Sequence, residues 1–190
     1  YGARGANGVI LVTTRQGSRD RLSLDYSFSY GWQSPCRTKD VLDATEYAVL
    51  MNEMNMNSGM SPVYDDPKSF GRGTDWQKEV FNYNAPVIEH QASISGGNDK
   101  LSYYLSFGYL YNEGIIGGNF NRSNYDRYSA RANTTYTFFD HQERNWLRNF
   151  RGGVNMAYSR TTSMSIGENS ERGSILGSAV SMSPIMKVYA

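Results

Sequence analysis

Glycines recur at every third position near the start of the sequence and resemble a phosphate-binding loop in their spacing. Gly2, Gly5 and Gly8 could present backbone amides to a phosphate. Such a loop follows a strand and opens a helix, and a nucleotide loop also carries lysine followed by serine or threonine. Here the glycines precede the apolar run 9–12, so we interpret them as a tight turn that leads into a strand. Phosphate binding is therefore not expected.

Few side chains could perform acid–base, nucleophilic or metal chemistry. His90 and His141 are the two histidines, and neither has a cysteine or second histidine at metal-ligand spacing. Cys36 is the one cysteine, which excludes an internal disulfide and a multi-cysteine metal site and favours a spare loop thiol. The aspartates at 65–66 precede Pro67, where a turn explains them. With no nucleophile elbow or zinc-protease helix, we predict no enzyme, no metal and no cofactor.

Composition points to strands and turns. Aromatic residues make up 14% of the 190 residues, glycine is frequent, and the net charge of +1 gives no reason to expect a nucleic-acid partner. No apolar run reaches the roughly 18 residues of a transmembrane helix. The mean hydropathy of -0.59 is compatible with a β-barrel, because barrel strands alternate and so average to low hydropathy.

Five segments alternate apolar and polar residues with a period of two, which predicts β-strands. In 21–32, leucines and aromatics alternate with serines and an aspartate, and about ten such residues cross a bilayer at the tilt of a barrel strand. The weakest segment is interrupted on its apolar face by His90. The predicted strands cover about 21–32, 87–96, 101–112, 127–139 and 150–160.

The ends of the apolar faces and the lengths of the connections favour a membrane barrel over a soluble sandwich. Aromatic pairs such as Tyr30 and Trp32 stand at strand ends, where barrels carry interfacial girdles. The long connection 33–86 is followed by a tight turn at 97–100, and longer and shorter links alternate again after it. Long loops on one side and short turns on the other are typical of outer-membrane barrels.

The long connection 33–86 is itself predicted to be partly helical. Residues 43–46 resemble a capping box, and Tyr47, Leu50, Met51 and Met54 then recur at helical spacing. A second helix is predicted to start at Thr74–Gln77, and a third over 175–182, before Pro184. We expect the methionine and tryptophan stripes of these helices to pack against the barrel rim.

The first fourteen residues carry the most specific motif. They resemble the end of the plug domain in SusC/RagA-family TonB-linked outer membrane proteins, with Ala3 where that family usually has serine. Later stretches are similar to the same family in the same order: 74–77, 93–100, 103–109, 128–133 and 182–184. The matching residues of the first motif are Tyr1, Gly2, Arg4, Gly5, Asn7 and Gly8.

The resemblance implies a fold class and a domain organisation. The fold would be all-β with loop helices, a partial transmembrane antiparallel β-barrel preceded by the last strand of a plug domain. Residues 1–18 would end the plug, and 19–190 would form the N-terminal part of a barrel of about 22 strands. Because the rest of such a barrel lies outside this sequence, we expect that these residues do not transport alone.

The resemblance also implies a function, partners and a location. Members import glycans or peptides across Bacteroidota-type outer membranes with a SusD-like surface lipoprotein, and the TonB–ExbB–ExbD complex supplies the energy through the plug. Outer-membrane lipid would surround the apolar faces. The polar faces supply the candidate lumen-facing residues Asp25, Glu89, Gln91, Arg131, Asn133, Arg151 and Asn155.

Two other readings stay open at the level of sequence. A secreted, soluble β-sandwich that binds glycans would explain the aromatics as sugar-stacking platforms, although it leaves the loop alternation unexplained. A receptor of the same family that signals through an additional N-terminal domain would also contain these residues. The substrate is not readable from the sequence.

Overall fold

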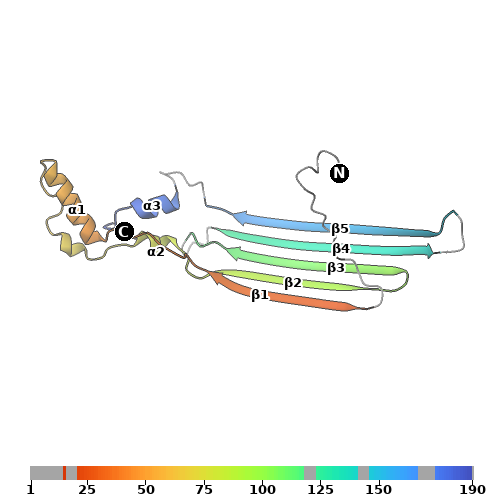
Figure 1. The fold of residues 1–190 in the computed structure, drawn as a ribbon. Helices are drawn as coiled ribbons and strands as arrows, with labels where there is room; N and C mark the ends of the chain where they lie inside the picture. The colour runs from red at the N-terminus through yellow and green to blue at the C-terminus, as the bar shows by residue number, and fades with distance from the viewer. Residues whose placement is uncertain (1–14, 16–20, 118–122, 141–145, 167–173, 190) are drawn as a thin grey trace. The chain divides into compact units, whose positions relative to one another are not determined.

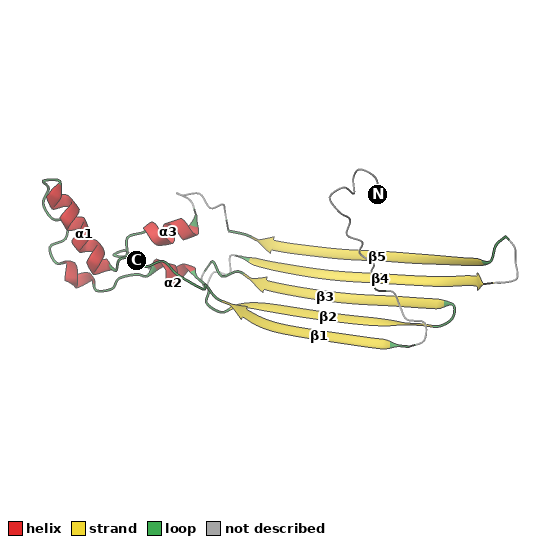
Figure 2. Cartoon of the chain, in the orientation of Figure 1, coloured by secondary structure: helices red, strands yellow, loops and turns green. Residues whose placement is uncertain are grey.

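The computed structural model describes residue 15 and residues 21–117, 123–140, 146–166 and 174–189 (Figure 1). The predicted turn and plug strand at 1–14 and His141 lie outside these residues. The elements are strands and short helices, with the helices between β1 and β2 and after β5 (Figure 2). No described helix has both the length and the apolar character needed to cross a membrane.

The described strands form one five-stranded sheet in which each strand pairs with its neighbours in sequence. The predicted all-β fold with helices in its loops is confirmed, and consecutive strands run antiparallel (Figure 1). The single sheet does not match the sandwich reading, which requires a second sheet packed on the first. The strands are β1 Ser23–Gln33, β2 Ala85–Gly97, β3 Leu101–Glu113, β4 Asn124–Asp140 and β5 Asn149–Met164.

Each strand overlaps one of the predicted ranges, and the largest differences are at the strand ends. β4 begins at Asn124 rather than 127, and β5 continues to Met164 rather than 160. Thr161, Thr162, Ser163 and Met164 are the residues added to β5, and threonine favours extended backbone. Alternation of apolar residues had ended by this point, so the periodicity gave no signal there.

The chain divides into two compact units. The first unit contains 1–28, 89–109 and 127–160, and its described part consists of strand segments and their turns. Within it the apolar side chains alternate with polar ones but are largely exposed: Leu24 is 77% exposed and Met156 61%. Apolar surface of this extent is a contact surface for lipid or another apolar body.

Two glycines near strand ends of the first unit lie beside aromatic side chains. A Cβ atom added to Gly96 would stand 2.7 Å from the hydroxyl oxygen of Tyr103, and one added to Gly152 would stand 3.1 Å from Cε2 of Phe138. Both contacts join neighbouring strands on the apolar face. The rings therefore cover backbone that a glycine leaves bare, and each pair opposes a slip in strand register.

The second unit contains 29–88, 110–126 and 161–190, and it holds the helices. They are α1 Ala44–Asn57, the 3-10 helix η2 Pro67–Phe70, α2 Trp76–Val80 and α3 Ile175–Ser181. The predicted capping box is present: Asp43 accepts from the Glu46 backbone N–H, and Glu46 accepts from the Asp43 N–H. The predicted second and third helices are also found, with Asp75 and Ser174 as their N-caps.

The packing face of α1 differs from the predicted one. The buried residues are Ala44, Ala48 and Asn52, whereas Leu50 is 44% exposed and Met54 54%. Small side chains let the following loop approach closely: the Ala44 N–H donates to the carbonyl oxygen of Arg72 at 3.0 Å. The hydrophobic stripe expected to pack against the barrel rim instead leaves much of its surface open.

Polar side chains fasten the loops of this unit. The Asn52 side chain donates to the Tyr64 carbonyl and accepts from the backbone N–H groups of Val63 and Tyr64. The buried Gln77 makes a matched pair of bonds with the backbone of Lys39. Trp76 Nε1 donates to the Ser183 carbonyl, which joins α2 to the segment after α3. These bonds satisfy backbone groups that no helix or strand pairs.

Asn52→Ala is predicted to loosen the loop after α1 without unfolding the sheet. The change leaves the N–H groups of Val63 and Tyr64 without their acceptor, at a cost of about 1–3 kcal/mol. Hydrogen exchange at these two amides should accelerate about tenfold. Asn57→Ala, at an exposed position of the same helix, is the matched control and should leave their exchange unchanged. Equal exchange in both variants would contradict this role for Asn52.

Candidate functional site

The polar face of the sheet collects hydroxyl, amide and charged side chains from all five strands. Alternation places the predicted residues of each strand on one face, opposite the exposed leucines and aromatics. No described residues form a group of three or more His, Cys, Asp or Glu side chains that could hold a metal ion. The residues of this face predicted to line a lumen are Asp25 on β1, Glu89 and Gln91 on β2, Arg131 and Asn133 on β4, and Arg151 and Asn155 on β5.

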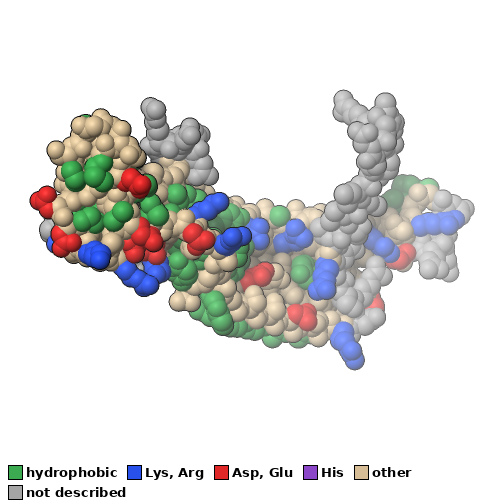
Figure 3. Space-filling view, turned by 60° about the vertical axis from the view of Figure 1, so that its left-hand side comes forward, with side chains coloured by type: hydrophobic (Ala, Val, Ile, Leu, Met, Phe, Trp, Pro, Cys, Tyr) green, Lys and Arg blue, Asp and Glu red, His purple; other side chains and the backbone are tan. Residues whose placement is uncertain are grey.

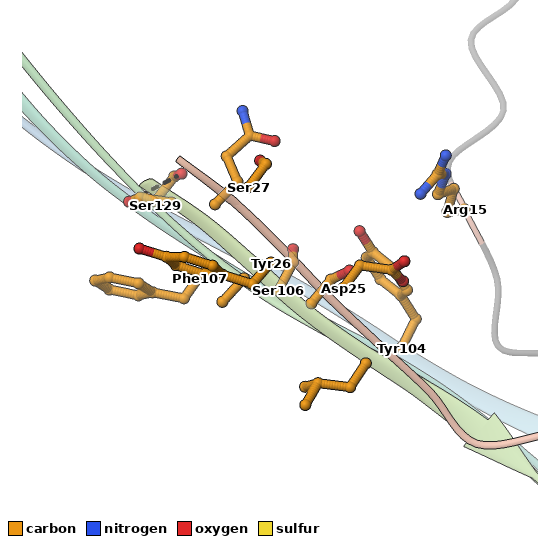
Figure 4. Close-up of a pocket in the computed structure, with 13 residues that line it drawn as sticks. Arg15, Asp25, Tyr26, Ser27, Tyr104, Ser106, Phe107 and Ser129 are labelled. Carbon is orange, nitrogen blue, oxygen red and sulfur yellow. Dashed lines mark hydrogen bonds between the residues drawn. The ribbon is translucent and has the colours of Figure 1, made fainter. Parts of the chain in front are cut away.

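A cavity of about 640 Å³ lies over β1, β2, β3 and β4 in the first unit (Figure 4). It brings together two of the predicted residues, Asp25 and Gln91, and it also contains Arg15, which comes from the chain before β1. Figure 4 shows Arg15, Asp25, Ser27 and Tyr104 on one side of the strands and Phe107 on the other. Ser27, Ser93, Ser106 and Ser129 supply hydroxyl groups to this cavity.

Other predicted residues have partners of their own. Gln91 donates from Nε2 to Oε1 of Glu89 at 2.6 Å, so neighbouring polar residues of β2 restrain each other. Arg131 lines a smaller cavity of about 240 Å³, together with Ser106, Ser129 and Ser159. Since Ser106 and Ser129 line both cavities, the polar surface continues from β1 to β5.

The remaining residues lie further along the strands. Arg151 forms an ion pair with Asp140 at 3.7 Å, where both side chains are nearly half exposed, so the pair contributes little to stability. Asn133 donates from Nδ2 to the carbonyl oxygen of Arg15 at 3.3 Å, which joins Arg15 to β4. Asn155 is an exposed residue of β5. The predicted motif residues Tyr1, Gly2, Arg4, Gly5, Asn7 and Gly8 lie outside the described part of the chain.

Sequence reasoning missed several residues of the cavity. The serines were assigned to the polar faces, but a serine in a serine-rich strand carries no signal that marks it as a contact residue. Tyr104 was missed because it interrupts the alternation of β3, where neighbouring tyrosines at 103 and 104 lie on opposite faces. The position of Arg15 depends on a contact between residues more than a hundred positions apart in sequence, which periodicity does not reveal.

The chemistry available on this face is hydrogen bonding rather than catalysis. Hydroxyls, amides and a few unlike charges can hold a polar solute by many weak contacts. Asp25 and Arg131 stand on β1 and β4, three strand spacings apart, or about 14 Å. Such a surface is suited to a hydrated passage or to contact with another polar protein surface.

A further cavity, of about 830 Å³, lies among the loops and helices of the second unit. Its lining includes Leu42, Tyr47, Trp76 and Met182, with Arg72 among the charged residues. Hydrophobic side chains reach the surface over the helical part of the chain (Figure 3). This unit therefore offers apolar and aromatic contact area, which the polar face of the first unit does not.

No protein-family model matches the chain, but related proteins were found by sequence. It is 28% identical over its whole length to TonB-dependent receptor P3 of Formosa agariphila and 31% identical to TonB-dependent receptor SusC of Bacteroides thetaiotaomicron. The chain spans 17% of the length of each. The relatives are named as receptors and not as enzymes.

Solved structures agree in fold. The chain superposes on the RagAB peptide transporter with a TM-score of 0.69 at 24% identity, over 97% of this chain and 23% of the other. For the RagAB peptide importer in the open-open state the TM-score is 0.64 at 25% identity, over 90% of this chain and 21% of the other.

Asn133→Ala is predicted to release the backbone of Arg15 from β4. Loss of the bond to the Arg15 carbonyl, at about 1 kcal/mol, should accelerate trypsin cleavage after Arg15 about fivefold in the folded protein. Asn155→Ala is the matched control, because it removes an asparagine from the same face of the neighbouring strand without touching Arg15. Time courses followed by mass spectrometry measure the cleavage, and equal rates in the two variants would contradict the proposed tie.

Proposed function

This chain has the sequence and the fold of a segment of the SusC/RagA-family TonB-dependent receptors, and we propose that it forms part of an outer-membrane transporter for nutrient import. In this proposal residues 1–18 end the plug domain and 19–190 form the N-terminal part of the barrel. The location would be the outer membrane of a Bacteroidota-type bacterium, in keeping with relatives from Formosa and Bacteroides.

The observation that carries the proposal is the division of one sheet into an apolar and a polar face. The apolar face leaves Leu24, Phe107 and Met156 more than half exposed, and hydrocarbon is the surrounding in which such a face is stable. The opposite face holds the serines and the charged and amide side chains Asp25, Gln91 and Arg131 that line the two cavities, and polar groups of this kind suit a water-filled interior. In a soluble binding module an exposed apolar face of this extent would be unfavourable, because it would lie in water.

We propose glycans or peptides as the cargo. The relatives include SusC, and the neighbours in fold are called a peptide importer and a peptide transporter. The polar face of the described strands carries hydrogen-bonding groups suited to either class, so the face itself favours neither. Energy would come from the TonB–ExbB–ExbD complex acting through the plug, to which the segment before β1 would connect.

We propose that the loop unit docks a SusD-like surface lipoprotein. The exposed apolar residues of α1 and the loop after it provide the contact surface, because hydrophobic side chains on an ordered helix gain by burial in a partner. Hydrogen bonds between the side chains of Asn52 and Gln77 and the loop backbone already hold the loops in place. Docking of a partner would therefore cost little conformational entropy of the loops. The exposed apolar residues of this surface are Val49, Leu50, Met54, Met56, Met60 and Val63.

Energy-dependent uptake is the first test of the proposal. Cells that express the complete gene product should accumulate labelled oligosaccharides or labelled peptides of one class, and an uncoupler of the proton-motive force should abolish this accumulation. A strain that lacks the gene is the control. Accumulation that persists with the uncoupler would contradict TonB-driven transport, while uptake of neither class would contradict the cargo.

Docking on α1 predicts that acidic substitutions weaken the complex with the lipoprotein. The double variant L50D/M54D places charge on the exposed apolar stripe and should reduce co-purification of the co-expressed lipoprotein at least tenfold. Glu53→Gln, an exposed position of the same helix, is the control and should bind as the wild type does. Undiminished binding of L50D/M54D, with the helix intact by hydrogen exchange, would place the interface elsewhere.

A further inference from the structure

The cavity of about 830 Å³ in the second unit is lined by three stretches of chain that are far apart in sequence. The first is the segment before α1 with the first turn of that helix, within 40–47. The second covers 72–78, and the third is the end of α3 with the residues after it, within 179–184. All three belong to the second unit. The volume lies in the range of about 300–1,000 Å³ that is usual for ligand sites.

Gly73 holds the three stretches close together. Its backbone has a φ of +67°, and a Cβ atom at this position would overlap the Ala44 side chain on one side and the Pro184 carbonyl on the other. The neighbouring Thr74 N–H donates to the Pro184 carbonyl oxygen at 2.8 Å. The walls of the cavity are therefore fixed by close packing and hydrogen bonds, so that a ligand would meet a site that is already formed.

Two side chains of opposite charge line this cavity and extend from fixed backbone. Asp40 follows Lys39, whose backbone makes two hydrogen bonds, at 2.9 and 2.7 Å, with the side chain of the buried Gln77. The carbonyl oxygen of Arg72 accepts from the Ala44 N–H at 3.0 Å. Among the described residues neither charged side chain has a hydrogen-bond or ion-pair partner, and the two do not pair with each other.

The other charged groups of the lining already have partners. Asp43 and Glu46 form the capping box of α1, and Asp75 pairs with Lys78 at 3.3 Å. One carboxylate and one guanidinium are therefore left for a ligand. A ligand that carries an ammonium group and a carboxylate would complement both, and a guanidinium holds a carboxylate through paired, charge-assisted hydrogen bonds.

The apolar part of the lining suits an aliphatic side chain better than a sugar. Leu42 is 43% exposed and Val180 48%, and neither side chain can bond to a sugar hydroxyl. Trp76, on which a sugar ring could stack, is half-buried, and its Nε1 already donates to the Ser183 carbonyl. An apolar side chain gains by burial here, whereas sugar hydroxyls would lose water without a replacement. The other apolar residues of the lining are Val41, Tyr47, Ala179, Met182 and Pro184.

We propose that this cavity binds a short, free peptide with an apolar side chain, and that Asp40 holds its ammonium group and Arg72 its carboxylate. The inference rests on the proposed function and deepens it, because it selects peptides from the two cargo classes and assigns their capture to the loop unit. The site is separate from the surface of α1 proposed to dock the lipoprotein. The lining ends on α1 at Tyr47, and the exposed apolar residues of the docking surface begin at Val49.

Peptide binding by the complete receptor tests this inference. The purified receptor in detergent is titrated with trileucine, and the affinity is measured by isothermal titration calorimetry. Arg72→Gln should weaken binding about tenfold and Asp40→Asn about fivefold, since each removes one charge-assisted contact. Lys68→Gln and Asp65→Asn are the matched controls. They remove one exposed charge of each sign from the same unit, outside the cavity, and should bind as the wild type does.

Capped peptides assign each charge to one end of the ligand. Trileucine amide has no carboxylate, so it should bind R72Q and the wild type equally. N-acetyl-trileucine has no ammonium group, so its affinity should be the same for D40N and the wild type. Triglycine should bind more weakly than trileucine, because it has no side chain to bury.

Three results would overturn the inference. The first is a wild-type receptor that does not bind trileucine. The second is an affinity for trileucine that neither R72Q nor D40N changes. The third is binding of maltotriose, an uncharged glycan, with the same dependence on Arg72 and Asp40 as trileucine shows.

The proposed function is checked separately in cells. R72Q should still reach the outer membrane and co-purify the lipoprotein, but it should accumulate less labelled trileucine than the wild type at peptide concentrations below saturation. Energy-dependent uptake by the wild type, with trileucine binding that the two substitutions leave unchanged, would refute this inference alone. Absence of the wild-type receptor from the outer-membrane fraction would instead contradict the proposed function, and the titrations of purified receptor would still decide whether the cavity binds peptide.

Discussion

Backbone hydrogen bonding between neighbouring strands is the constraint on which the rest of this structure depends. Hydrocarbon offers no partner for a peptide N–H or C=O, so a chain that crosses a bilayer as strands must satisfy these groups from strand to strand. The order β1-β2-β3-β4-β5, with every strand beside its neighbour in sequence, does this with local hairpins. Once the backbone is paired, the side chains alternate between the two sides of the sheet, which gives one apolar and one polar face.

The helices are subject to a different constraint. They occur where the chain leaves the sheet, and their loops are fixed by side chains that bond to backbone rather than by a large hydrophobic core. Asn52 and Gln77 are buried polar residues, and each makes paired contacts with an otherwise unbonded backbone segment. Because polar contacts hold these loops, the apolar side chains of α1 need not be buried and are available at the surface.

Local patterns predicted the sheet and the helix starts, but not what the helices bury. Alternation is a property of one strand, and a capping box is a property of four residues, so both are visible in sequence. The burial of Ala48 in place of Leu50 depends on how closely the segment around Arg72 approaches α1. The cavity residues are similarly non-local. Strand pairing brings Asp25 and Ser129 to one cavity, and a hydrogen bond from Asn133 holds Arg15 beside them. A serine in a serine-rich strand carries no signal that marks it as a cavity residue.

The surroundings of His90 depend on strand register and are not visible in the local sequence. In the sequence it is a polar residue that interrupts an apolar face, and it has no cysteine or second histidine at metal-ligand spacing. The hydrogen bond to Tyr26 and the contacts with Phe28 and Tyr109 make it one member of a row that crosses the sheet. The Tyr26 hydroxyl gives the imidazole a polar partner, which lowers the cost of a polar side chain within an apolar face.

The two edges of the described sheet carry backbone groups that no described strand pairs. Among the described strands, β1 and β5 each pair on one side only. In lipid the other side of each would leave a row of peptide groups unsatisfied, at several kcal/mol per group. Assembly in a membrane is therefore favourable only when further strands pair with both edges. In the proposed transporter further strands would pair with both edges, and the chain spans 17% of the length of the relatives.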